Sequence, residues 1–165
     1  MQITLKGNPI NLNGEFPEVG QAAPDFTLTT SSLADVSLEE YTGKKKVISI
    51  VPSLDTPVCA TSTQKFNQEV SNKENVALLV VSGDLPFAAG RFCEANSTGA
   101  AVTLSTMRDQ NFANDYGVLM ADGPLAGLTA RAVIVLDEDN KILHAELVPE
   151  IAQEPDYEAA LAALG

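Results

Sequence analysis

One cysteine of this chain lies in a local pattern that could make its thiol reactive. Residues 52–59, PSLDTPVC, directly follow the apolar run 47–51. Thr56 is a good helix cap, Pro57 suits the first helical position, and Cys59 then falls in the first turn. Backbone N–H groups are unpaired at such a helix start, and the helix dipole is positive there. The pattern therefore favours a negatively charged sulfur at Cys59.

A negatively charged sulfur matters because the thiolate, and not the thiol, is the nucleophile. A free cysteine has a pKa of about 8.5, so only about 3% of it is ionised at pH 7. A helix start and a nearby cation together can lower the pKa of a cysteine by about 2.5, equivalent to roughly 3.4 kcal/mol. Asp55 opposes this effect, so a cation is required, and the candidates are Arg131, Arg91 and Arg108.

The alternative for both cysteines is an inert role in the core, where free cysteines are common. The local pattern leaves this alternative open for Cys59, which could simply pack beneath its helix. For Cys93, which follows an aromatic residue in Arg91-Phe92-Cys93-Glu94, a core position is the favoured interpretation of the local pattern. Two cysteines in 165 residues do not form a disulfide scaffold.

The composition predicts a single soluble domain in the cytoplasm. The chain has 165 residues, of which 45% are hydrophobic, and its net charge is −12. Such a charge repels nucleic acid and anionic membrane surfaces. The longest apolar run, 76–81, is far shorter than the roughly 20 residues of a membrane span. The first residues, MQITLKGNPI, do not resemble a secretory signal.

Strands and helices are expected to alternate along most of the chain. The N-terminus should form a hairpin with turns at Asn8-Pro9 and Asn13-Gly14, and three lysines, Lys44 to Lys46, should form a solvated edge. Further strands are expected at 25–28, 47–51, 76–81 and 102–104, and an antiparallel hairpin at 131–136 and 142–147. Helices are expected from a Ser37 cap to Gly43, from Cys59 through Val70, at 86–94, at 111–116 and along 157–164, with Pro155 in the first turn of the last.

This order predicts an α/β protein with a mixed central sheet between helices. Crossover helices produce parallel strand pairs, and the late hairpin adds an antiparallel edge. In such sheets, reactive groups collect where the carboxyl end of a strand leads into a helix, which is where residues 52–59 lie.

The residues Pro52, Thr56 and Cys59 match the pattern Pro-x-x-x-Thr-x-x-Cys, which resembles the active-site signature of the peroxiredoxins. Nearly the whole chain is similar to one group of that family, the atypical two-cysteine bacterial thiol peroxidases. The similarity extends over segments 19–20, 23–28, 91–93, 116–118, 122–125, 130–133 and 154–158.

The resemblance implies a thioredoxin-like fold with an added N-terminal hairpin, over residues 1–17. It implies that Cys59 is the peroxidatic cysteine, with Thr56, Pro52 and Arg131 forming its pocket, and that Cys93 is the resolving cysteine of the same subunit. The implied activity is reduction of hydrogen peroxide and organic hydroperoxides through a sulfenic acid and a Cys59–Cys93 disulfide. Thioredoxin would be the reductant, the protein would be a homodimer, and no metal, flavin or haem would be needed.

Other functions are less well supported by the residues. A thioredoxin-like dithiol oxidoreductase should carry Cys-x-x-Cys, but Thr56 stands three positions before Cys59. A cysteine hydrolase needs a base, and the only histidine, His144, belongs to a late strand. One histidine and two separated cysteines are poor support for a zinc site. A non-enzymatic interaction domain with the same fold remains open.

Overall fold

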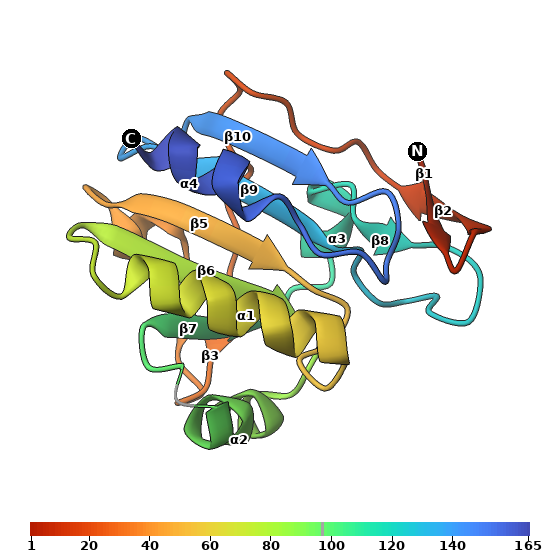
Figure 1. The fold of residues 1–165 in the computed structure, drawn as a ribbon, viewed down its shortest axis with the longest axis horizontal. Helices are drawn as coiled ribbons and strands as arrows, with labels where there is room; N and C mark the ends of the chain where they lie inside the picture. Colours follow the sequence, from red (N-terminus) through yellow and green to blue (C-terminus); the bar gives the residue numbers. More distant parts are fainter. Residues whose placement is uncertain (97) are drawn as a thin grey trace.

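The computed structural model describes residues 1–96 and 98–165 and shows a mixed seven-stranded sheet flanked by helices (Figure 1). The strand order is β10-β9-β5-β6-β7-β3-β4. The strands are β3 (Leu28–Thr30), β4 (Asp35–Val36), β5 (Lys45–Ile50), β6 (Val76–Ser82), β7 (Ala101–Ser105), β9 (Ala132–Leu136) and β10 (Ile142–Leu147). The helices are α1 (Pro57–Val70), α2 (Pro86–Asn96), α3 (Phe112–Asp115) and α4 (Tyr157–Leu164), with a 3₁₀ turn, η1, at Leu38–Tyr41.

Three central strands are parallel, and the strands outside them are antiparallel. β5, β6 and β7 run parallel and are joined by the crossover helices α1 and α2. β9 pairs antiparallel with β5 and with β10, and β3 pairs antiparallel with β7 and β4. The expected α/β class and mixed sheet are therefore confirmed.

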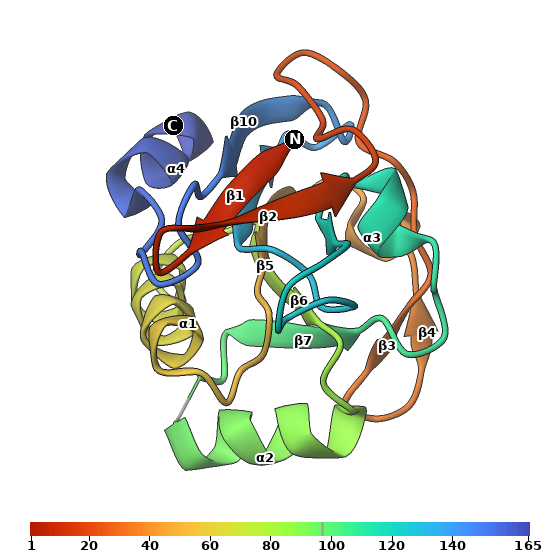
Figure 2. The same cartoon turned by 90° about the vertical axis from the view of Figure 1, so that its right-hand side faces the viewer.

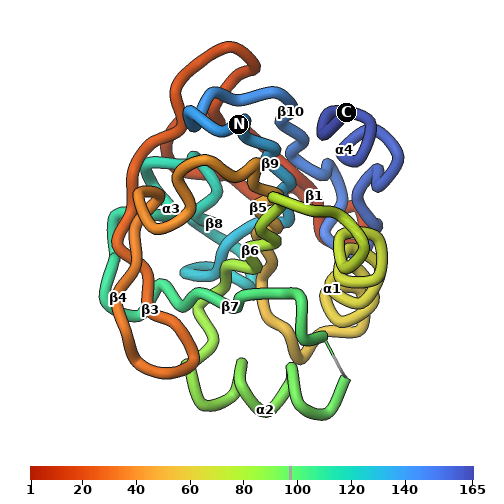
Figure 3. Tube along the Cα trace, turned by 90° about the vertical axis from the view of Figure 1, so that its left-hand side faces the viewer, coloured from red at the N-terminus to blue at the C-terminus, as the bar shows by residue number. Residues whose placement is uncertain are grey.

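Two apolar clusters cover the two faces of this sheet. Alternate residues of β5 point to opposite sides, so Val47 packs with α1, α2 and α4, whereas Ile48 packs with α3 and the N-terminal segment. Figure 2 shows α1 and α4 on one side of the sheet and α3 on the other. The trace in Figure 3 shows the same two layers from the opposite end.

The N-terminal hairpin is present, but its turn lies earlier than expected. β1 (Gln2–Leu5) and β2 (Asn8–Asn13) pair antiparallel, and β8 (Leu119–Met120), a strand that the pattern did not indicate, extends them to a second sheet. The turn is at Lys6-Gly7, whose φ angles are 50° and 82°. Positive φ at both central residues gives the turn a twist that matches the paired strands. The prediction of a turn at Asn8-Pro9 is therefore wrong.

Three other local predictions are also corrected by the structure. The strand expected at 25–28 begins only at Leu28, because the Asp25 carboxylate accepts bonds from the backbone of Phe26 and Leu38. The Ser37 side chain makes no capping bond, and the expected helix is only the 3₁₀ turn η1. Pro155 precedes the cap of α4 instead of lying in its first turn, since Asp156 is the cap and accepts from the Ala159 N–H.

Lys46 is buried instead of lying on a solvated edge. Lys46 belongs to β5, and its side chain is fully buried. Its ammonium group donates to the carbonyls of Asp137 and Glu138 and to Asn140 Oδ1, at 3.3, 3.4 and 2.7 Å. Burial lowers the pKa of Lys46. Lys46 thus fastens the turn between β9 and β10, a contact between segments about 90 residues apart.

Gly117 shows how the N-terminal segment closes against α3. Its φ is 65°, and a Cβ there would lie 2.3 Å from the carbonyl carbon of Glu15. Only glycine allows both this conformation and this approach.

The helices that the structure describes are all too short or too polar to span a bilayer.

Candidate active site

Three chain segments converge beside the start of α1. Because β5 and β9 are antiparallel, the carboxyl end of β5, which leads to Cys59, lies beside the start of β9, which follows Arg131. β10 runs antiparallel to β9, so residues 148–151, which follow β10, reach the same edge. The Val148 N–H donates to the Arg131 carbonyl at 3.0 Å, and the Thr129 hydroxyl donates to the Val51 carbonyl at 2.7 Å.

Cys59 lies in the first turn of α1, as the sequence predicts. Pro57 is the first helical residue, and the Cys59 side chain is fully buried in the apolar cluster beneath the helix. Its carbonyl accepts bonds from the hydroxyls of Ser62 and Thr63 at 3.0 and 2.9 Å. The thiol is therefore held at a helix start and shielded from solvent in this conformation.

Of the three candidate cations, the structure places Arg131 at the sulfur. Arg131 Nη1 donates to Cys59 Sγ at 3.1 Å, and the arginine side chain is only 2% exposed. Arg131 Nε and Nη2 both donate to the Ile151 carbonyl, at 3.2 and 2.9 Å. The guanidinium is thus fixed on one side by a backbone oxygen and faces the sulfur with a remaining N–H group.

The charge of Arg131 makes the contact with Cys59 electrostatically significant. Among residues 1–96 and 98–165, no carboxylate lies within ion-pair distance of Arg131. A buried cation without an anionic partner is costly, so an anion at its donor group is strongly favoured. The Cys59 sulfur is in position to be that anion.

The Glu154 carboxylate is close enough to Arg131 to feel its positive charge. Its carboxylate bonds to the Lys65 ammonium at 3.1 Å and accepts from the Tyr157 hydroxyl at 3.0 Å. These two bonds lower the pKa of Glu154, and the positive charge of Arg131 adds to the effect. The Lys65 ammonium also lies 5.0 Å from the centre of the Tyr157 ring, so this group ties the side of α1 to the segment before α4.

Thr56 occupies the capping position of α1 but does not cap it with its side chain. Its hydroxyl donates to the Ser53 carbonyl at 2.9 Å, and no side-chain capping bond is present. The predicted cap position of Thr56 is therefore confirmed, but the capping bond that its hydroxyl could make is absent. Pro52 is buried at the start of the same loop.

Asp84 is a residue of this site that the sequence reasoning missed. Its carboxylate accepts from the Ser53 hydroxyl and the Leu54 N–H, both at 2.7 Å, and from the Ser82 hydroxyl at 2.8 Å. Asp84 thereby fixes the loop that carries Pro52 and Thr56. A carboxylate two positions after a buried parallel strand was the signal available, since side chains there meet neighbouring loops.

Cys93 lies on α2 and packs against the apolar cluster that contains Cys59. Its side chain is partly exposed, and both cysteines are free. Cys93 lines an open groove of about 500 Å³ with Ser31, Phe87, Gly90 and neighbouring residues of α2. Gln64 Nε2 donates to Asn96 Oδ1 at 2.8 Å, which joins α1 to the end of α2. Ser97 lies outside the described residues.

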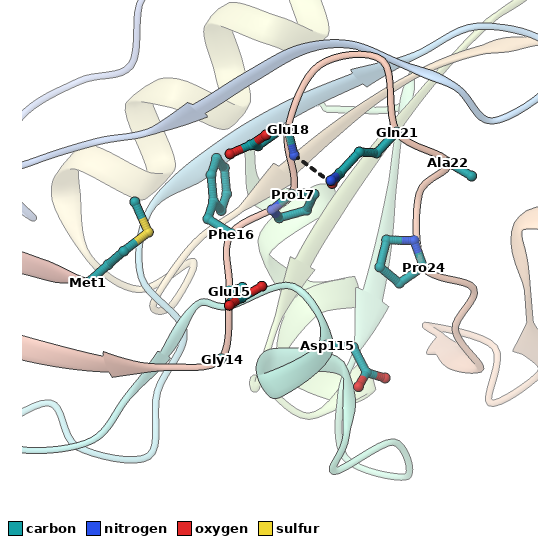
Figure 4. Close-up of a pocket in the computed structure, with 10 residues that line it drawn as sticks. All are labelled: Met1, Gly14, Glu15, Phe16, Pro17, Glu18, Gln21, Ala22, Pro24 and Asp115. Carbon is teal, nitrogen blue, oxygen red and sulfur yellow. Dashed lines mark hydrogen bonds between the residues drawn. The ribbon is translucent and has the colours of Figure 1, made fainter.

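A second groove runs along the outside of the Cys59 helix turn. It has a volume of about 300 Å³ and is lined by Pro57, Val58 and Thr61 of α1 and by Ala152 and Glu154. A larger groove, of about 920 Å³, lies between the N-terminal segment and α3 (Figure 4). Its lining includes Glu15, Glu18 and Asp115 and neither cysteine, so it is separate from the sulfur chemistry.

The remaining sequence candidates lie apart from the Cys59 sulfur. Arg108 pairs with Asp35 at 3.0 Å, and Arg91 is exposed on α2. His144 is in β10, and its Nε2 is buried without a hydrogen-bond partner, so it does not orient a nucleophile. In the described part of the chain, no group of three or more histidine, cysteine or carboxylate side chains is arranged to hold a metal ion.

Comparisons with known proteins identify a matching family, similar sequences and similar folds. The model of the family described as Redoxin matches residues 18–161. The chain is 53% identical to a thiol peroxidase of Mycobacterium tuberculosis over 164 residues, covering 99% of this chain and 98% of the relative. A peroxiredoxin-like protein from Aquifex aeolicus superimposes with a TM-score of 0.91 at 40% identity, covering 99% and 95% of the two chains. A thiol peroxidase from Chromobacterium violaceum has the same fold, with a TM-score of 0.93 at 24% identity, over 99% of this chain and 95% of that one.

Proposed function

Because this chain belongs to the redoxin family and is a thiol-dependent peroxidase of the peroxiredoxin type, we propose that Cys59 is the sulfur that attacks the hydroperoxide. The observation that carries this assignment is the 3.1 Å contact between Arg131 Nη1 and Cys59 Sγ. In this contact a buried positive charge lies beside the sulfur of one cysteine, at the start of a helix. Such a charge stabilises the thiolate form of the cysteine.

In the first step, the Cys59 thiolate attacks one oxygen of the hydroperoxide and the O–O bond breaks. The sulfur retains that oxygen as a sulfenic acid, and the second oxygen leaves with its electron pair and takes up a proton, giving water or an alcohol. Negative charge develops on the leaving oxygen, and we propose that the Arg131 guanidinium and the N–H groups at the start of α1 stabilise it. Thr56 and Pro52 are proposed to shape this pocket.

In the second step, the Cys93 thiol condenses with the sulfenic acid of Cys59, a disulfide forms and water leaves. A reduced thioredoxin then exchanges its dithiol for this disulfide, so the two cysteines return to thiols and the thioredoxin is oxidised. The partial exposure of Cys93, in contrast to the burial of Cys59, supports its role as the resolving cysteine.

Formation of this disulfide is expected to change the helices that carry the cysteines. Cys59 and Cys93 lie in regular turns of separate helices, whereas a disulfide requires Cα atoms within about 7 Å. The first turn of α1, part of α2 or both should therefore unwind locally in each cycle. Crystal structures of the reduced and oxidised forms should differ around the two cysteines, and structures that superimpose there would contradict the prediction.

The proposed cycle is tested by counting thiols in the unfolded protein after the reduced protein has met one equivalent of hydrogen peroxide. The free-thiol count should fall from two to zero and return to two after treatment with reduced thioredoxin. In Cys93→Ser, the single thiol should be consumed and remain as a sulfenic acid that dimedone labels. Loss of one thiol or none in the wild-type protein would contradict the proposed pairing.

The setting of the enzyme is also proposed. We place it in the cytoplasm, because its cycle needs an environment in which thiols are kept reduced.

A homodimer is supported by two large apolar side chains near the Cys93 groove, Leu85 and Phe87, which are 56% and 71% exposed. The hairpin of residues 1–17 is proposed to belong to the same single domain, since residues 3, 10 and 12 are buried in one of the two main clusters.

A further inference from the structure

We infer that Glu150 is a positioning residue for catalysis, through which the N-terminal hairpin holds the Ile151 carbonyl that orients Arg131 toward Cys59. This inference rests on the proposed role of Cys59. It assigns the hairpin a function in the chemistry, although none of its residues touches the sulfur. The chain of contacts that supports it runs from Thr4 and Gly7 through Glu150 to Arg131.

The first link is the pairing of β1 with the segment after β10. The Thr4 N–H donates to the Pro149 carbonyl at 2.8 Å, and the Ile151 N–H donates to the Thr4 carbonyl at 2.9 Å. Residues 149–151 therefore lie against β1 in the manner of a short parallel strand. This backbone pairing fixes the position of Ile151 along the hairpin.

The second link is the Glu150 carboxylate, which uses both of its oxygens. Oε1 accepts from the Thr4 hydroxyl at 3.0 Å and from the Gly7 N–H, in the hairpin turn, at 2.9 Å. Oε2 accepts from the Ala152 N–H at 2.9 Å. The carboxylate thus bridges the hairpin turn to the Ala152 N–H, and it restrains the peptide unit that contains the Ile151 carbonyl.

The third link is the Ile151 carbonyl itself. It accepts from Arg131 Nε and Nη2, so two of the guanidinium donors are aimed at one oxygen. A planar guanidinium held in this way has a fixed orientation, and Nη1 then points to Cys59 Sγ. A shift of the Ile151 carbonyl would therefore turn the N–H group that faces the sulfur.

The Glu150 carboxylate keeps its negative charge at every pH at which the site would be tested. The N–H groups of Ala152 and Gly7 lower the pKa of Glu150 to about 2. A carboxylate with a lowered folded-state pKa contributes stability that is present above its unfolded pKa, about 4.5, and is lost as the pH falls through about 2. Glu150 stays ionised from pH 5 to 9, so its own titration does not alter the site in that range.

The test is the pH profile of Cys59 alkylation in a Cys93→Ser background, which leaves a single thiol. Glu150→Gln keeps the size of the side chain and removes its charge, so its bonds to the N–H groups weaken. The pH midpoint of alkylation should rise by about 0.5 to 1 because Arg131 is less well oriented toward the thiolate. The midpoint is the quantity of interest, since easier access to the buried sulfur would change the plateau rate only.

Asp122→Asn is the matched control. Asp122 is another exposed carboxylate that holds the hairpin, accepting from the backbone and side chain of Asn11 at 2.9 and 2.7 Å, and these bonds lower its pKa. It makes no bond to residues 149–152 within the described chain. Asp122→Asn should lower the melting temperature about as much as Glu150→Gln while leaving the alkylation midpoint unchanged.

A Glu150→Gln midpoint no higher than that of Asp122→Asn, in two folded variants, would overturn the inference and leave Glu150 a purely structural residue. If Glu150→Gln does not fold, Thr4→Val serves instead. It removes the hydroxyl that donates to Glu150 Oε1 at 3.0 Å and to the Pro149 carbonyl at 3.3 Å, and it leaves the backbone pairing of Thr4 in place. Thr4→Val should raise the midpoint by a smaller amount, and an unchanged midpoint would overturn the inference. Alkylation does not require turnover, so these results are independent of whether Cys59 reduces peroxide.

Discussion

Replacement of Cys59 by serine should abolish peroxidase activity, to less than about 1% of the wild-type rate. Serine preserves the size of the side chain, but a hydroxyl beside Arg131 is almost entirely protonated at neutral pH and is a poor nucleophile toward an O–O bond. The measurement is consumption of hydrogen peroxide with reduced thioredoxin as the electron donor. Residual turnover above a few per cent would mean that another group performs the attack.

Cys93→Ser is the matched control for this substitution. It removes the other sulfur and leaves the contact between Arg131 and Cys59 intact. The variant should react once with peroxide at a rate close to that of the wild-type protein and then stop as the sulfenic acid, because no second thiol is available to form the disulfide. A complete lack of reaction in Cys93→Ser would reverse the assigned roles of the two cysteines.

Removal of the Arg131 charge should produce the second largest effect. Arg131→Met retains much of the apolar volume of a side chain that is 2% exposed and removes the cation at the sulfur. We expect the rate of reaction with hydrogen peroxide at pH 7 to fall by about 10² to 10³, the usual consequence of losing one group that stabilises developing charge in an enclosed site. Stopped-flow measurement of Cys59 oxidation, in the Cys93→Ser background, gives this rate directly.

Two further variants separate charge from structural damage. Arg131→Lys keeps a positive charge but cannot make the paired bonds of the guanidinium to the Ile151 carbonyl. Its rate should therefore lie between the rate of the wild-type protein and that of Arg131→Met. Arg108→Met removes an exposed arginine that pairs with Asp35 away from the sulfur, and it should leave the rate unchanged. Equal losses in Arg131→Met and Arg108→Met would contradict a specific role for Arg131.

The central elements of this fold could be predicted because their residues carry a strong local signal. Buried runs such as 76–81, the proline at the start of α1 and the acidic turn between β9 and β10 each specify a local conformation. β4 and β8 could not be predicted, since each is only two residues long and is defined by its pairing partner. Lys46 looked like a surface residue because its three oxygen partners come from a turn about 90 residues later.

Only part of the site could be predicted, because only part of it depends on residues that are close in sequence. The position of Cys59 follows from a helix start that can be read in eight residues, but the choice of Arg131 among three arginines depends on the pairing of β5 with β9. The partner that fixes Arg131 is a backbone carbonyl, that of Ile151, and no side-chain pattern reveals a carbonyl. Glu150 contacts a hairpin that is distant in sequence, so its role became visible only in the fold. For Asp84, the position just after a buried strand was a signal, but its partners in the loop 53–54 could not be read from the sequence.

The most direct test of this account is the rate of Cys59 oxidation by hydrogen peroxide as a function of pH, measured in Cys93→Ser. If the buried guanidinium favours the thiolate, the rate at pH 7 should stay within about twofold of the rate at pH 9. A rate that falls about tenfold for each pH unit below about 8.5, as it does for a free cysteine, would contradict the account.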